Sequence, residues 1–429
     1  MRPFLLLPAL LIAAPLPAQA PADSLVAALR SVAAPLSLSP AGELAGEAGA
    51  GLAARVRAAR FVLLGEEHGL ADVPRLATAL WRAGSGPGER YLAIEVGEQM
   101  AARLEAALRS DTTGEAYLRF TAEHRPGAPF YFWREDAALL RAVVASTPGQ
   151  RGVFWGLDYD ILADRHVLEP LRTLARTPAS RRLVDSAATV VDSAFARALW
   201  EGNPGMFYMF GGSPELFRRL REGLRPAAGS VGDRILDLLE ETLAINQLFM
   251  AGQGYESNLR RSTLLKRQFL RMYDSARVAR GRPPRVLLKF GAAHLLRGLN
   301  PSRQFDLGTL LPDLALQDGA EWLSVYAIGG AGAHYAQFDP RTLRSVELSS
   351  ADTQEEWTRP FLQAAAPEGW TVFDLKALRP AAGRLGTLPT GVREILYGVD
   401  LVVVLTGSEP QHDLLPALPE GAAGHAPTH

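Results

Sequence analysis

The sequence predicts an α/β fold, with a largely parallel central sheet, flanking helices, a helical insert and two related halves. Short apolar segments alternate with amphipathic helical patterns, as in parallel strands joined by crossover helices. A strongly helical stretch at about 160–280 interrupts this alternation. Two apolar segments, 60–64 and 286–290, each run into a Gly-x-x-His motif, which suggests that the two halves of the chain are related.

The first twenty residues have the pattern of a secretory signal peptide. Arg2 supplies the positive end, Phe4–Pro17 is apolar, and Ala18–Ala20 is an A-x-A cleavage site. The apolar stretch is too short for a spanning helix and contains two prolines. We therefore expect cleavage near Ala20, a periplasmic or secreted protein, and no stable membrane insertion.

Residues 21–410 are expected to form one α/β domain with the helical insert, and residues 411–429 a flexible tail. Residues 21–59 read as two short helices joined by a loop at Pro35–Pro40, since Pro and Ser favour loops. The following elements are assigned from apolar runs and from helical periodicity. Predicted strands are 60–64, 91–95, 152–158, 286–290, 322–328, 371–373 and 401–405, and predicted helices outside the insert are 73–82, 99–108 and 134–144.

Composition excludes several classes of function. The chain has no Cys, which rules out disulfides, a thiol nucleophile and thiolate metal sites. It has 45 Lys and Arg against 46 Asp and Glu, which gives no electrostatic case for binding nucleic acid. The G-x-S-x-G, HExxH and Walker A patterns are absent from the sequence. A small-molecule substrate is the expected partner, and the oligomeric state is not predicted.

Acidic or histidine side chains follow four of the predicted strands. Because the carboxyl ends of parallel strands meet at one edge of a sheet, we expect these side chains to share a site. Taken singly, each is explained as well by a helix start, a cap or a buried structural histidine. Four such strand ends together favour a site. Their side chains are Glu66, Glu67 and His68 after the first strand, and then Glu95, Asp158 and His294 after the other three.

We predict catalytic roles for His68, His294, Glu66 and Glu95, with Glu67 and Asp158 in support. His68 is expected to be a general base or a metal ligand, because histidine titrates near neutral pH. Glu66 and Glu95 would orient it or complete a metal shell. His294 would bind the opposite side of the reacting water or stabilise an oxyanion. A metal would be held by His68, Glu95 and His294.

Other polar and aromatic segments are weaker candidates. The aromatic segments Phe130–Trp133 and Met206–Phe210 could line a pocket, although helix packing explains the second equally well. In the basic stretch 260–271, most cations are expected to be solvated, with one or two reaching the site to hold an anion. The remaining histidines are expected on loops or helix surfaces or in the tail: His124, His166, His334, His412, His425 and His429.

The motifs at Leu64–Gly69, Ala93–Glu95, Gly156–Asp158 and Gly291–His294 resemble those of the erythromycin-esterase-like/ChaN-like superfamily. That group is similar to the TraB and TIKI proteins, which share paired GxxH motifs. The resemblance spans roughly residues 55–300. It implies a parallel α/β fold with a helical insert and a cleft that holds two histidines and two or more glutamates.

The resemblance also implies three different chemistries. In the esterases a histidine activates water for lactone hydrolysis, in TIKI-like members the GxxH histidines ligate a metal in a protease, and ChaN-like members bind haem. One residue separates Glu66 from His68, as in the ChaN-like spacing, where the esterases have two. The leading hypothesis is an exported hydrolase that activates water against an ester or lactone, with or without a divalent metal. The alternative is a haem- or metal-binding protein without turnover.

Overall fold

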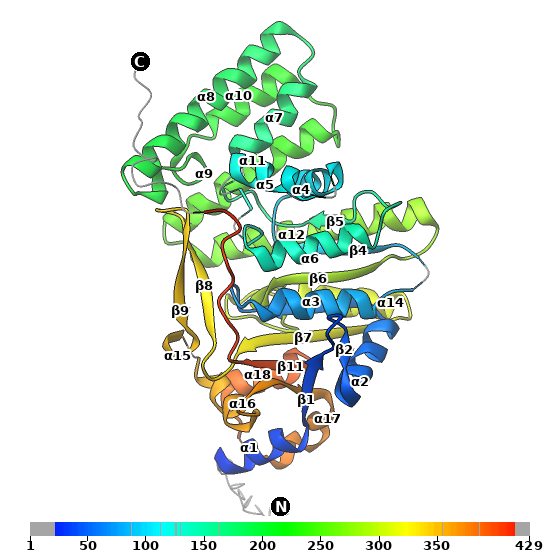
Figure 1. Cartoon of the computed structure of the whole chain (residues 1–429). Helices are drawn as coiled ribbons and strands as arrows, with labels where there is room; N and C mark the ends of the chain where they lie inside the picture. Colours follow the sequence, from blue (N-terminus) through cyan, green and yellow to red (C-terminus); the bar gives the residue numbers. More distant parts are fainter. Residues whose placement is uncertain are drawn as a thin grey trace, which may run out of the picture.

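The structure is a computed structural model that describes residues 22–416, except positions 87, 112, 125, 126, 129, 163, 354 and 386 (Figure 1). The predicted signal peptide and residues 417–429 of the predicted tail, with His425 and His429, lie outside the described residues. Among the helices of the described part, none is long and apolar enough to cross a membrane.

Within the described residues, nine strands form one sheet in the order β2-β1-β10-β11-β7-β3-β6-β4-β5. The strands from β11 to β5 all run parallel, whereas β10, β1 and β2 extend the sheet in antiparallel pairing. The predicted α/β fold with a largely parallel sheet is therefore confirmed. The strands are β1 (Ala33–Leu38), β2 (Leu44–Ala45), β3 (Ala59–Glu66), β4 (Arg90–Ile94), β5 (Phe154–Gly156), β6 (Arg285–Gly291), β7 (Glu321–Gly329), β10 (Gly369–Asp374) and β11 (Leu401–Thr406).

The two strands that precede the GxxH motifs are neighbours near the middle of the sheet. β3 and β6 pair in parallel, and Glu66 lies opposite Gly291. Alternate residues of β3 face opposite sides, so Val62 and Leu64 join one apolar core while Phe61 and Leu63 join another. This pairing brings two motifs that are distant in the sequence to the same edge of the sheet.

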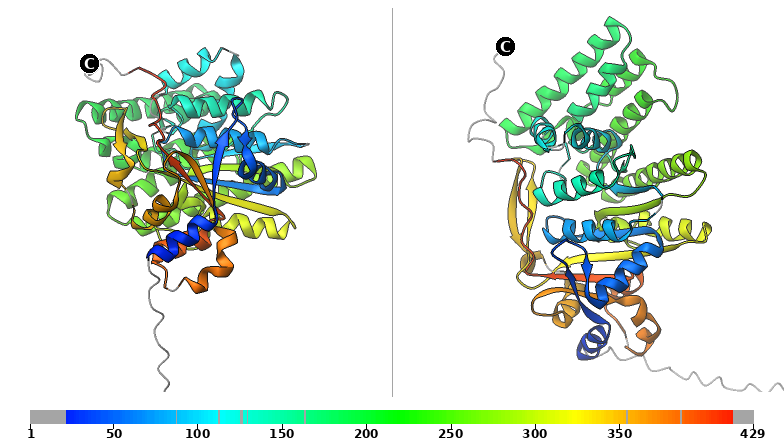
Figure 2. Two further views of the ribbon diagram at one scale, coloured as in Figure 1. Left: turned by 60° about the horizontal axis from the view of Figure 1, so that its bottom comes forward. Right: turned by 45° about the vertical axis from the view of Figure 1, so that its right-hand side comes forward.

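Helices cover both faces of the sheet (Figures 1 and 2). The first face carries α2 (Gly46–Ala58), α3 (Asp72–Ala83), α4 (Glu98–Ser110) and α6 (Arg134–Ala145). The opposite face carries α12 (Gly254–Arg280), α14 (Leu307–Gln317), α1 (Ala22–Ser31), α16 (Arg359–Ala364), α17 (Leu375–Leu378) and α18 (Thr390–Gly398).

Of the helical insert predicted at about 160–280, the helices from α7 to α11 rise beyond the β5 edge of the sheet at the top of Figure 1, whereas α12 covers a face of the sheet. α11 packs against α12 and α7, so the insert is anchored to the helix that covers the sheet. Its helices are α7 (Asp164–Leu174), α8 (Pro178–Trp200), η1 (Pro204–Met206), α9 (Tyr208–Gly211), α10 (Glu215–Leu224) and α11 (Val231–Met250). The remaining short helices of the described chain are α5 (Glu115–Glu123), α13 (Ala292–Leu295), α15 (Ser350–Thr353), η2 (Glu356–Thr358) and η3 (Arg379–Arg384).

Two strand regions differ from the sequence prediction. The loop predicted at Pro35–Pro40 is wrong for most of its length, because residues 33–38 form β1 between β10 and β2. Pro35 misled the prediction, since proline lacks the N–H that an inner strand uses, yet here it lies opposite Thr371 in the ladder. The hairpin of β8 (His334–Asp339) and β9 (Arg344–Ser349) was not predicted.

The hairpin packs directly against the loop after the first motif. The Ala336 N–H donates to the Gly69 carbonyl at 3.0 Å, and the His334 N–H donates to the Ser408 carbonyl at 2.8 Å. Gly69 has a φ of 92°, and a Cβ built on it would lie 2.0 Å from the Ala336 carbonyl oxygen. The glycine is therefore required both by its backbone conformation and by the closeness of the hairpin.

We expect Gly69→Ala to lower the free energy of unfolding by more than the ~1–3 kcal/mol that a strained backbone position costs, because the new methyl also displaces β8. Gly332→Ala is the matched control: Gly332 has a φ of 67° and no atom within 4 Å of a built Cβ, so only backbone strain is added. Urea denaturation measures both losses. Equal losses in the two variants would contradict the close approach of the hairpin.

Candidate active site

His68 is held in a fixed orientation at the end of β3. Its Nδ1 lies 2.9 Å from Glu66 Oε1, and its ring stacks on Phe130 with ring centroids 4.0 Å apart and an interplanar angle of 11°. A Cβ built on Gly291 would lie 2.9 Å from His68 Nε2, so only glycine leaves room for the ring here. The Nε2 atom therefore faces the start of the second motif.

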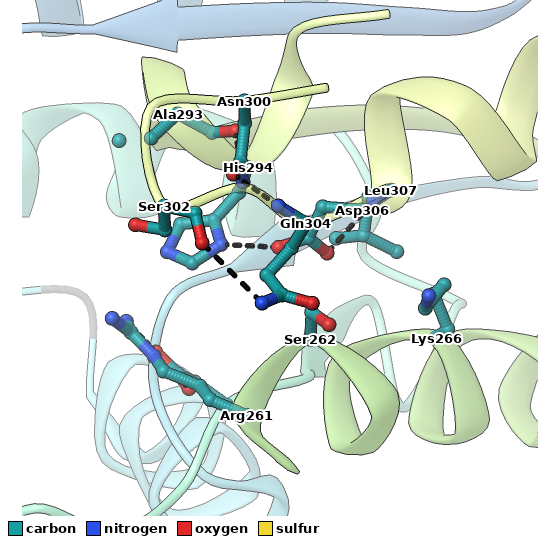
Figure 3. Close-up of polar contacts among 12 residues, drawn as sticks. Arg261, Ser262, Lys266, Ala293, His294, Asn300, Ser302, Gln304, Asp306 and Leu307 are labelled. Carbon is teal, nitrogen blue, oxygen red and sulfur yellow. Dashed lines mark hydrogen bonds and ion pairs between the residues drawn. The ribbon is translucent and has the colours of Figure 1, made fainter. Parts of the chain in front are cut away.

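His294 has the same kind of support on the second motif (Figure 3). It lies in α13, and its Nδ1 is 2.8 Å from Asp306 Oδ2. Asp306 is itself fixed as the N-cap of α14, where Oδ1 accepts the Leu307 N–H at 2.8 Å. Asn300 ties the intervening loop to the motif by donating from Nδ2 to the Ala293 carbonyl at 3.0 Å. Each histidine is thus anchored at Nδ1 by a buried carboxylate.

Glu95 lies between the two rings. The Nε2 atoms of His68 and His294 are each 3.6 Å from one of its oxygens, Oε2 and Oε1 respectively. This separation exceeds hydrogen-bonding distance, so both Nε2 atoms stay available to a water or a substrate oxygen. Glu95 Oε2 also accepts the Gly291 N–H at 2.7 Å.

The surroundings keep Glu95 ionised although it is buried. Burial raises the pKa of Glu95. The positive charges of His68, His294 and Arg261, together with the Gly291 N–H, lower this pKa by more than burial raises it, and it falls to about 2. The negative charge of Glu95 favours a proton on His68.

Arg261 is the cation of the basic stretch that reaches the site. From α12 it donates to Asp158 through Nε at 3.0 Å and Nη2 at 2.5 Å, and through Nη2 to Glu95 Oε1 at 2.8 Å. The expectation that one such cation enters the site is met, but the anions that Arg261 holds are carboxylates of the chain itself. Asp158 therefore acts by positioning Arg261, and Arg261 by holding Glu95.

A buried lysine that sequence reasoning missed supports Glu66. Lys289 on β6 is 1% exposed, and its Nζ lies 2.7 Å from Glu66 Oε1 and 2.9 Å from Asp136 Oδ1. Burial raises the pKa of Glu66, but Lys289 and His68 lower it below its usual value. Burial lowers the pKa of His68, but Glu95 and Glu66 raise it above its usual value. The lysine thus keeps Glu66 charged, and Glu66 in turn favours a proton on His68.

Two adjoining cavities meet at His68. The polar chamber, of about 420 Å³, is lined by Glu66, His68, Glu95, Asp158, Arg261 and His294 among others. The aromatic chamber, of about 570 Å³, is lined by residues that include Phe130, Trp133, Phe207, Phe210, Tyr335 and Phe338. Four residues line both chambers: His68, Phe130, Ile161 and Tyr326. Both aromatic segments singled out in the sequence contribute to the second chamber.

The structure separates the predicted residues into groups. Glu66, His68, Glu95, Asp158 and His294 line the polar chamber, whereas Glu67 lines the aromatic chamber and accepts the Gly329 N–H through Oε2 at 2.9 Å.

The surface assignment of two other histidines is wrong. His124 and His166 are buried with ring centroids 4.2 Å apart, because α5 and α7 pack them against each other beside Arg103. His334 and His412 are partly exposed and ion-paired with Glu347 and Glu135, but His334 lies on strand β8 and not on the predicted loop or helix surface.

The predicted metal ligands do not fit a metal ion as they stand. His68, Glu95 and His294 come together, but among the described residues no group of three His, Asp or Glu side chains is arranged to hold a metal. Both oxygens of Glu95 already accept hydrogen bonds, and the Arg261 guanidinium lies where a second cation would be repelled. For haem, the aromatic chamber offers His68, Tyr326 and Tyr335, which are residue types that ligate haem iron.

No protein-family model and no curated protein matches this sequence. Solved structures do match it. A mutant of the erythromycin esterase EreC in its open conformation aligns with a TM-score of 0.57 at 14% identity, covering 86% of this chain and 95% of that one. The chain has the fold of EreC.

Two further structures share this fold. A succinoglycan biosynthesis protein aligns with a TM-score of 0.58 at 14% identity, over 91% of this chain and 98% of that one. A protein from Bacillus cereus aligns with a TM-score of 0.56 at 13% identity, over 92% and 100%. The resemblance seen in the motifs is thus confirmed at the level of the fold. Identities of 13–14% show a shared fold and do not show a shared activity. ChaN of Campylobacter jejuni, solved with haem, aligns with a TM-score of 0.30, which is too low to place a haem here.

Lys289→Met is expected to lower the free energy of unfolding by about 3–5 kcal/mol near pH 7, since it leaves Glu66 and Asp136 buried without their cation. The pKa values of both carboxylates rise in the variant, so the loss should shrink as the pH falls and they become protonated. Urea denaturation at neutral and acidic pH measures this. Lys376→Met, at an exposed position, is the control. A loss no greater than that of the control would contradict the role of Lys289.

Proposed function

We propose that the chain is an exported hydrolase that uses water to cleave an ester or lactone. The observation that carries the proposal is the paired arrangement of the histidines. Each has a carboxylate at Nδ1, and each directs Nε2 toward Glu95 in one chamber. An acid at Nδ1 that fixes the tautomer and leaves Nε2 free is the arrangement that general-base catalysis uses. Export is proposed from the signal sequence at residues 1–20.

In this reaction His68 is the base. Its Nδ1–H donates to Glu66, so Nε2 has the lone pair that removes a proton from water while the water oxygen adds to the carbonyl carbon. In this step His294 is protonated on both ring nitrogens, so that Nδ1–H donates to Asp306 and Nε2–H donates to the carbonyl oxygen as it becomes negative. The leaving alkoxide then takes the proton from His68, which yields the acid and the alcohol. The aromatic chamber accommodates an apolar group on one side of the bond.

The second candidate function is haem binding without turnover. It is favoured by one observation, the aromatic chamber with His68, Tyr326 and Tyr335 in its wall. Against it, the two ring nitrogens of His68 face Glu66 and Glu95. Titration with haemin decides this point, and an absorption spectrum that stays that of free haemin would contradict haem binding.

We expect His68→Asn and His294→Asn each to lower kcat about 10²–10⁴-fold on the esters that wild type cleaves, since each removes a proton-transfer or oxyanion-binding group. The assay is a panel of aryl esters and lactones, a macrolide included, with and without a chelator. His334→Asn, at a surface ion pair, is the matched control. Full activity in either catalytic variant would contradict the two-histidine site. Loss of wild-type activity with the chelator would instead show that a metal takes part in the reaction.

The acid limb of the pH profile of kcat/KM should report His68. Because the neutral ring is the base and its pKa is raised, activity should increase as the pH rises through a value above about 6.5. Glu66→Gln removes a carboxylate that raises this pKa, so the limb should move to lower pH. Glu368→Gln, at an exposed site, should leave the limb in place. A limb that does not move in Glu66→Gln would exclude His68 as the titrating base.

A further inference from the structure

We infer that the aromatic chamber binds a cationic group of the substrate, so that the preferred substrates are esters or lactones that carry an alkylammonium group. This inference rests on the proposed hydrolase function and specifies its substrate. The chamber is enclosed by the sheet edge, the β8–β9 hairpin, and η1 and α9 of the insert.

The charged residues in the wall of this chamber point to a cation. Apart from His68, the charged side chains that line it are Glu67 and Glu355, and no described Lys or Arg lines it. Burial raises the pKa of Glu67 to about 6 against the opposing effect of the Gly329 N–H, and the nearby negative charge of Glu355 adds to the rise. An anionic substrate group would be repelled by both, and a cation would relieve their mutual repulsion.

Both carboxylates are bound by neutral donors. Glu67 Oε2 accepts the Gly329 N–H at 2.9 Å, and Glu355 Oε2 accepts the Trp357 Nε1–H at 2.6 Å. These bonds fix the carboxylates without neutralising them. The polar chamber is different, because there Arg261 forms ion pairs with both Glu95 and Asp158. The aromatic chamber is therefore the part of the site with no Lys or Arg among its described lining residues.

The rest of the wall specifies the kind of cation. Aromatic rings attract organic cations through their faces, and an alkylammonium also buries its methyl or methylene groups against them. A hydrated divalent metal would instead require a shell of oxygen ligands. Seven Phe, Tyr and Trp side chains among the described residues contribute to this wall: Phe130, Trp133, Phe207, Phe210, Tyr326, Tyr335 and Phe338.

The two chambers are placed for one substrate molecule. His68, Phe130 and Tyr326 line both of them, so a substrate whose ammonium group lies beside Glu67 extends its ester bond past His68 into the polar chamber. Cation binding would thereby position the carbonyl carbon near His68 Nε2.

Hydrolysis of a matched pair of esters tests the inference. The pair is butyrylcholine and its neutral isostere, in which a quaternary carbon replaces the nitrogen. We expect wild type to favour the cationic ester by at least about tenfold in kcat/KM. This ratio should fall toward one in Glu67→Gln, in Glu355→Gln and in the double variant. The ratio should be unchanged in Glu368→Gln, which removes an exposed carboxylate elsewhere. A wild-type ratio of one or less overturns the inference.

Binding of a cation that cannot be hydrolysed separates this inference from the proposed function. Phenyltrimethylammonium is titrated against the tryptophan fluorescence of wild type, of His68→Asn and of the double glutamine variant. Binding to wild type and to His68→Asn that weakens at least tenfold in the double glutamine variant supports the cation site. If neither ester is cleaved in that case, the proposed hydrolase function is wrong and the cation site still stands. Cleavage of the neutral ester with no cation binding leaves the hydrolase intact and overturns the cation site. Circular dichroism of each variant shows whether it is folded.

Discussion

The site depends on the need to keep two buried carboxylates charged at the carboxyl edge of the sheet. A carboxylate there is unstable unless it is paired. Glu95 is stabilised by Arg261, by the Gly291 N–H and by the two histidines, and Glu66 by Lys289 and His68. These partners come from strands and helices that are distant in the chain. The ion pairs therefore hold the two motifs, α12 and the sheet in one arrangement.

The fold supplies this arrangement through one pairing. Because β3 and β6 are neighbours in register, the two GxxH motifs end side by side, and Gly65 and Gly291 let their turns approach closely. His68, in the turn after β3, and His294, in the short helix α13 after β6, both line the polar chamber. The β8–β9 hairpin and the insert then add the aromatic chamber, which divides the site into a part that activates water and a part that selects the substrate.

The sequence was sufficient for the parallel sheet and for the strand-end residues, because apolar runs that end in Gly, Asp or Glu are local signals. It was not sufficient for partners that only three-dimensional packing identifies. Asp136 and Asp306 lie at helix starts, where an acid needs no special explanation. Lys289 gave a signal, a charge inside an apolar strand, which indicates a buried counter-ion. β1 and the hairpin were missed because Pro35 and the polar residues of β8 hide their strand character.

The central claim is that both histidines are anchored at Nδ1 by a carboxylate and direct Nε2 into the polar chamber, where His68 accepts a proton from water and His294 donates to the carbonyl oxygen. Nitrogen NMR of ¹⁵N-histidine-labelled protein, with His68→Asn and His294→Asn used for assignment, measures this directly. The account predicts that the neutral ring of His68 carries its proton on Nδ1, and that His294 carries a proton on Nδ1 beside Asp306. A proton on Nε2 of His68 would contradict it, because the base would then have no lone pair facing the chamber.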